Sequence, residues 1–197
     1  EMNKVALALP ILILGFAAQA SDRQHSNVSE YAGQEKQAIK SLSPDDIAEL
    51  KRGGGWGLAK AAELNGVPGP AHLLEMKDEI LLTDAQVSTI TKIYEGMKTL
   101  AIQQGERLIT LERELEGHFQ SRTINDKILR SSLEATAMAR KELRYIHLAT
   151  HLQMPEILSP AQIEKYNALR GYAKPDPCAN IPKGHDPAMW RKHNGCK

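Results

Sequence analysis

Two histidines near residue 150 stand one helical turn apart, a spacing suited to binding a metal ion. His147 and His151 occupy positions i and i+4 of a segment rich in helix-forming residues, so both imidazoles fall on one face of the expected helix. His72 and Met76 repeat this spacing earlier in the chain. Neutral imidazoles bind Zn, Ni, Co or Cu, and a thioether favours Cu(I). We therefore expect His72, His147 and His151 to bind one such ion, with Met76 or Glu75 as the fourth ligand.

A structural interpretation of the same side chains stays open. The paired histidines would then be exposed or satisfied by hydrogen bonds, and Met76 would only fill space in the core.

The elements that must position these side chains are two long helices. Apolar residues recur at steps of three, four and seven over residues 84–119 and again over 124–154, after which Pro155 ends or kinks the helix. A short turn between two long helices makes them antiparallel neighbours. The sequence thus predicts an all-α fold, a long antiparallel helical hairpin. Shorter flanking helices are expected at 44–50, 58–64, 71–81 and 160–169.

Two helices alone have too few layers to bury both of their faces, so either the short helices cover the hairpin or a second subunit does. We expect a homodimer.

Composition and charge exclude several classes of protein. Aromatic residues make up only 5% of the 197 residues, which argues against a β-sandwich or barrel. The formal net charge is +1, so no basic excess supports nucleic-acid binding. The chain lacks a P-loop, a dinucleotide fingerprint and a nucleophile elbow. Its acidic residues and histidines form no arrangement with catalytic spacing, so we do not expect an enzyme.

The first 20 residues have the layout of a secretory signal peptide. A short basic start at Lys4 is followed by an apolar run of about 13 residues, fewer than the ~20 that span a bilayer. Ala18-Gln19-Ala20 then offers a cleavage site. We expect export to a bacterial periplasm, with an uncleaved anchor as the alternative. Residues 21–69 would form an N-terminal extension with short helices.

The proline-rich tail, residues 173–197, carries two cysteines and is expected to be irregular. In an oxidising compartment Cys178 and Cys196 are expected to form a disulfide. The alternative is a metal site in which His185 and His193 join the two thiolates.

One helix-start motif occurs twice. The copies are Leu82-Thr83-x-x-Gln86 and Leu158-Ser159-x-x-Gln162. In each copy the hydroxyl residue suits the N-cap, and the glutamine three residues later can reach back to the backbone N–H of the cap, which forms a capping box. The leucine before each cap can pack against the apolar residue at the fourth helical position.

With this repeated motif and the long-helix layout, residues 70–172 resemble the Spy/CpxP family of periplasmic stress proteins, whose hallmark is a twice-occurring L-T-x-x-Q and whose relatives include the heavy-metal proteins ZraP and CnrX. The resemblance implies an all-α hairpin, often a cradle-shaped antiparallel dimer. It also implies ATP-independent chaperoning, stress signalling or metal sensing. We expect a chaperone for unfolded or misfolded periplasmic proteins that a metal ion can modulate. The alternative is a periplasmic sensor or resistance protein for Zn, Ni, Co or Cu, with a membrane-bound signalling partner.

Overall fold

The computed structural model describes residues 27–172, 177–178 and 181–196, and this part of the chain contains helices and no strand. The chain divides into two units, residues 1–35 and 36–197. The described part of the first unit forms short turns, with a hydrogen bond of 3.1 Å from the Ala32 N–H to the Ser29 carbonyl. The predicted signal peptide lies outside the described residues. None of the described helices is both long and apolar enough to cross a membrane.

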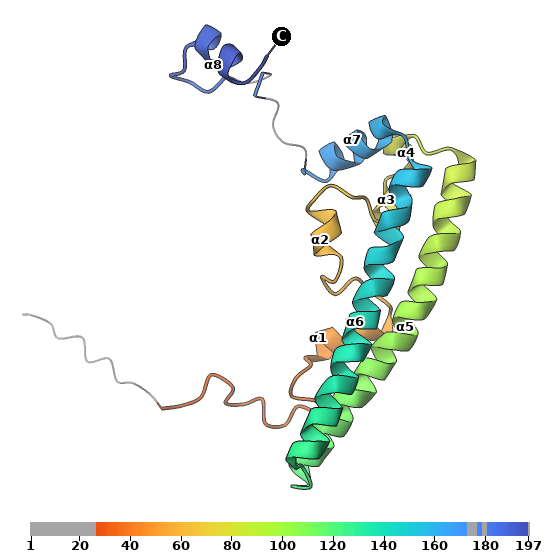
Figure 1. Ribbon diagram of the computed structural model, residues 1–197, viewed down its shortest axis with the longest axis vertical. Helices are drawn as coiled ribbons and strands as arrows, with labels where there is room; N and C mark the ends of the chain where they lie inside the picture. Colours follow the sequence, from red (N-terminus) through yellow and green to blue (C-terminus); the bar gives the residue numbers. More distant parts are fainter. Residues whose placement is uncertain (1–26, 173–176, 179–180, 197) are drawn as a thin grey trace, which may run out of the picture. The chain divides into compact units, whose positions relative to one another are not determined.

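Two long helices, α5 (Asp84–Gln120) and α6 (Asp126–Ile157), pack against each other as a hairpin (Figure 1). The prediction of an all-α fold built on a helical hairpin is therefore confirmed. α6 runs on through Pro155 to Ile157, three residues past the expected end. Pro155 has no N–H to donate to the His151 carbonyl, and only two helical residues follow it, so its effect is confined to the last turn of the helix.

In the described part of the chain, six short helices accompany the hairpin. They are α1 (Pro44–Lys51), α2 (Lys60–Glu63), α3 (Pro70–Glu75), α4 (Lys77–Ile80), α7 (Pro160–Leu169) and α8 (Pro187–His193). Helices α1 and α3 pack on α5, and α3 also contacts α6. Helix α4 contacts α7.

The structure corrects two of the expected short elements. The single helix predicted over residues 71–81 is broken at Met76, whose backbone angles of −107° and 22° are not helical. The tail, expected to be irregular, contains α8, which begins with Asp186 capping the Met189 N–H at 2.8 Å and with Pro187 at the first helical position.

Gly105 in α5 determines how closely α1 approaches the hairpin. A Cβ atom at this position would stand 2.5 Å from the Leu50 carbonyl oxygen, closer than real Cβ atoms come. The absence of a side chain lets the end of α1 pack directly on the backbone of α5 and brings Leu50, 2% exposed, into the core.

The buried apolar side chains of the described residues form two clusters. One contains Ile39, Leu42, Leu50, Leu58, Met97, Ala101, Leu108, Ile109, Ala139, Leu143 and Ile146. The other contains Leu73, Ile80, Ile90, Met154, Leu158 and Tyr166. Residues before position 70 thus contribute to the core together with the hairpin. By contrast, residues 110–138, all of them described, include no buried side chain.

Candidate functional site

A cleft of about 680 Å³ brings together most of the predicted metal ligands. Its lining includes His72 and Glu75 from α3 and His147 and His151 from α6. The segments that enclose it are the glycine-rich loop 53–57, the start of α3 and the facing sides of the two long helices. Met76 does not line the cleft, because the break between α3 and α4 directs it to the second apolar cluster.

The ring of His151 is held by the connector that joins α2 to α3. Its Nδ1 lies 2.9 Å from the Val67 carbonyl oxygen. A carbonyl can only accept, so Nδ1 carries the proton in the neutral ring and Nε2 keeps its lone pair. A histidine oriented in this way by a carbonyl group is typical of metal ligands.

Gly69 allows the connector to lie against this ring. A Cβ at Gly69 would meet His151 Cε1 at 2.7 Å and Nε2 at 2.8 Å. Any other residue at this position would push the imidazole away from its place in the cleft.

His147 is 4% exposed, and its Nε2 atom is buried without a hydrogen-bond partner. Burial lowers the pKa of His147, and the nearby His151 lowers it further. The ring is therefore neutral near neutral pH, with a nitrogen that the protein leaves unsatisfied. A buried polar atom of this kind costs free energy unless a water or an ion binds it.

The remaining predicted ligands are arranged less tightly. His72 Nδ1 lies 2.7 Å from Glu75 Oε2, so the two residues pair with each other at the rim, with side chains 38% and 67% exposed. Among the described residues, no group of three or more His, Cys, Asp or Glu side chains is arranged to hold a metal ion. The three histidines therefore line one cleft, but the described His, Cys, Asp and Glu side chains do not by themselves complete a metal site there.

The connector itself is positioned by α7. The carboxylate of Glu63 accepts hydrogen bonds from the Tyr166 hydroxyl at 2.7 Å and from Arg170 Nε at 3.0 Å. Burial raises the pKa of the Tyr166 phenol, and the hydrogen bond to Glu63 adds to this effect. Asn167 Nδ2 donates to the Gly66 carbonyl at 3.1 Å. These bonds fix the stretch just before Val67, whose carbonyl orients His151.

Two further residues, Met97 and Trp56, line the cleft without a sequence signal for a site. Met97 on α5 fits the helical periodicity, which by itself indicates a core position. Trp56 lies in the glycine-rich loop with a φ of 43°, an unusual value for a bulky side chain. Its indole donates to Asp46 Oδ1 at 2.8 Å, and the Arg140 guanidinium stands 4.5 Å from the ring centre. No local sequence signal predicts these partners.

Both copies of the repeated motif form capping boxes, at Thr83 and at Ser159. The two glutamines also pair with each other across the fold. Gln86 Nε2 donates to Gln162 Oε1 at 2.9 Å, and Gln162 Nε2 donates to Gln86 Oε1 at 3.0 Å. The repeated motif therefore joins the starts of α5 and α7 in addition to capping each helix. Leu82 packs against the second apolar cluster, and Leu158 belongs to it.

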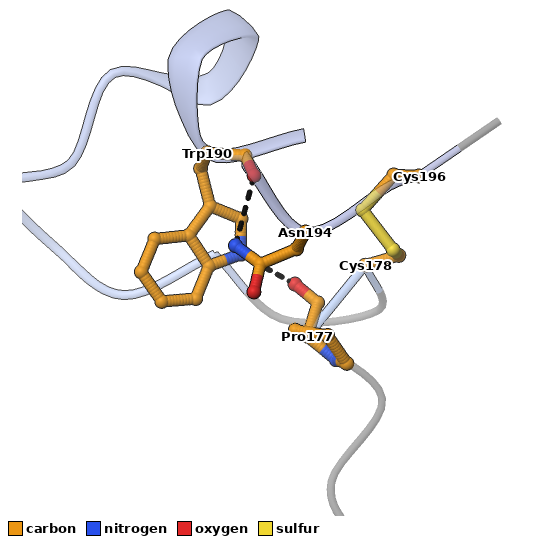
Figure 2. The surroundings of a disulfide bond; sticks show 5 residues. All are labelled: Pro177, Cys178, Trp190, Asn194 and Cys196. Carbon is orange, nitrogen blue, oxygen red and sulfur yellow. Dashed lines mark hydrogen bonds between the residues drawn. A yellow bond between two sulfur atoms is a disulfide. The ribbon is translucent and has the colours of Figure 1, made fainter. Parts of the chain in front are cut away.

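In the tail, Cys178 and Cys196 form a disulfide with a Cα–Cα distance of 5.6 Å (Figure 2). Figure 2 shows the Trp190 indole nitrogen donating to the Pro177 carbonyl, at 2.6 Å. The ring of His185 stands edge-on to Trp190, with 4.7 Å between their centres. With both sulfur atoms in the disulfide, the thiolates needed for the alternative metal site are absent from this state.

Comparisons of the chain with models of protein families, with curated proteins and with solved structures find no match.

Proposed function

We propose that this protein is an ATP-independent chaperone of the periplasm that binds unfolded proteins through apolar side chains on its hairpin. The observation that carries the proposal is the bare outer surface of the two long helices. Six large apolar side chains on these helices are at least half exposed: Leu100, Phe119, Leu133, Met138, Tyr145 and Leu152. Side chains of this kind suit a protein that binds the apolar segments of unfolded chains.

Three of these side chains form a stripe along α6. Met138, Tyr145 and Leu152 follow one another at steps of seven residues, so they share one face of the helix. They are 53%, 63% and 72% exposed. The stripe extends over about 21 Å of helix length, enough for an extended peptide of roughly six residues.

The likeness of the repeated motif to Spy/CpxP proteins also supports this function. A homodimer belongs to the same proposal, because a second copy could cover the surface of residues 110–138, where the described structure buries no side chain. Export to the periplasm rests on the layout of the first 20 residues.

The test is suppression of aggregation of a chemically denatured client by the full chain without nucleotide. We expect near-stoichiometric wild-type protein to suppress light scattering and Met138→Ser/Tyr145→Ser/Leu152→Ser to lose most of this activity. Leu64→Ser and Met189→Ser are matched controls, because these side chains are 63% and 73% exposed but lie off the hairpin. An inactive wild type, or a triple variant as active as the wild type, would contradict the proposal.

A second candidate function, periplasmic sensing or sequestration of a heavy metal, is favoured by one specific observation, the buried and unpartnered Nε2 of His147 beside His151. Calorimetric titration with Zn, Ni and Cu tests it. Equal heats from the wild type and from His147→Ala/His151→Ala would rule out this site.

A further inference from the structure

Three soft or neutral donors from the two long helices line one cleft. His147 and His151 project from adjacent turns of α6, and Met97 projects from α5. Their exposed fractions are only 4%, 6% and 9%.

The contacts of Thr150 place the sulfur of Met97 close to the turn that carries both histidines. The Thr150 hydroxyl lies 3.7 Å from Met97 Sδ and 2.7 Å from the His147 carbonyl oxygen. The thioether therefore faces α6 at the level of the two imidazoles.

None of the three donor atoms is engaged in a strong hydrogen bond with another described residue. Nε2 of His147 has no partner. His151 uses Nδ1 for the Val67 carbonyl, which leaves Nε2 with its lone pair. Within the described part of the chain, the Met97 sulfur accepts a single weak hydrogen bond, from the Thr150 hydroxyl.

From this arrangement we propose that His147, His151 and Met97 form a binding site for Cu(I). The inference rests on the second candidate function above, and it adds the oxidation state of the metal and a ligand, Met97, in place of the predicted Met76.

The chemistry of the donors selects a soft monovalent ion. Thioether sulfur binds Cu(I) in preference to Zn²⁺ or Ni²⁺, whereas imidazole accepts all of them. Burying a divalent ion among neutral donors also costs more than burying a monovalent one, because the desolvation penalty rises with the charge.

The carboxylates that line the cleft have other partners. Glu63 is bonded to Tyr166 and Arg170, Glu75 pairs with His72, and Glu49 pairs with Arg52. No carboxylate is therefore left to balance the second charge of a divalent ion at this point of the cleft.

The experiment is anaerobic competition for Cu(I) between the full chain and a chromophoric Cu(I) chelator, with ascorbate as the reductant so that the tail disulfide stays intact. The wild type should bind one equivalent. Met97→Leu, which conserves volume, should weaken Cu(I) binding at least about tenfold. Met76→Leu is the matched control and should bind like the wild type, because Met76 packs in the second apolar cluster.

X-ray absorption of the copper-loaded wild type gives a measurement that needs no variant. We expect scattering from two imidazoles and one sulfur, and we expect the sulfur shell to disappear in Met97→Leu. Wild-type affinity in Met97→Leu, or spectra without sulfur, would overturn the Cu(I) site. If Zn or Ni still binds through the histidines in that case, the second candidate function stands while this inference fails.

Discussion

The hairpin has a covered part and a bare part, although both are built from the same kind of helix. In the covered part, α1, α3 and the segment around Ile39 pack on α5, and side chains such as Ile90 and Leu143 are at most 1% exposed. In the bare part, residues 110–138, the described structure buries no side chain. Helical periodicity therefore determines which face of a helix is apolar, while elements distant in sequence determine whether that face is buried.

The boundary between the two parts is marked by polar contacts. Lys40 pairs with Glu116, and the Ser41 hydroxyl donates to Glu112 at 2.7 Å. These bonds hold the segment before α1 against α5 just where burial ends. The covered part contains the histidine cleft, and the bare part carries the exposed apolar side chains of Phe119, Leu133 and Met138.

The largest expected difference between the covered and the bare part is in the free energy of unfolding that is lost when a leucine is replaced by alanine. Leu143→Ala removes a residue that is 1% exposed and should lower the free energy of unfolding by about 2–5 kcal/mol. Leu133→Ala, at a position 51% exposed, should cost under about 1 kcal/mol. Urea unfolding followed by circular dichroism measures both. Equal losses would mean that the two parts are packed alike.

An intermediate effect is expected where the two motif glutamines meet. Gln86→Ala removes the bond to the Thr83 N–H and the pairing with Gln162, and it should cost about 1–2 kcal/mol. In a double-mutant cycle, Gln86→Ala and Gln162→Ala should show a coupling of about 0.5–1 kcal/mol. Gln153→Ala, an exposed glutamine on α6, is the control. If the losses of stability in the two single variants simply add up in the double variant, the hydrogen bonds between the two glutamines contribute nothing beyond the two separate helix caps.

The smallest expected effect is the dependence of stability on pH in the covered part. The pKa of His147 is lowered in the fold from its ordinary value of 6.5. As the pH falls below about 6.5, the unfolded chain takes up a proton that the folded chain resists, so stability declines. His147→Leu should flatten this decline, while His118→Leu in the bare part should not. Thermal unfolding between pH 7 and pH 5 measures it, and identical slopes for all three proteins would contradict the burial argument.

Much of the fold could be predicted from local signals. The start of α5 at Asp84 and the start of α7 at Pro160 follow from their capping boxes, and the antiparallel hairpin follows from the short turn. The break at Met76 could not be predicted in this way, because no proline or glycine marks it.

The candidate site was predictable only in part, because some of its features depend on residues distant in the sequence. The spacing of His147 and His151 indicates a shared face of one helix, and the structure places both on the cleft. The roles of Val67, Met97 and the Gln86–Gln162 pair depend on contacts across the fold, which spacing along the chain does not encode.

The central proposal is that the exposed apolar stripe of α6, formed by Met138, Tyr145 and Leu152, binds unfolded proteins. Photocrosslinking to a denatured client tests it most directly, with p-benzoylphenylalanine placed at Tyr145 or at Lys165, both of which are exposed. We expect crosslinked client from position 145 and little from position 165 on α7. Equal yields at the two positions, or none at position 145, would contradict it.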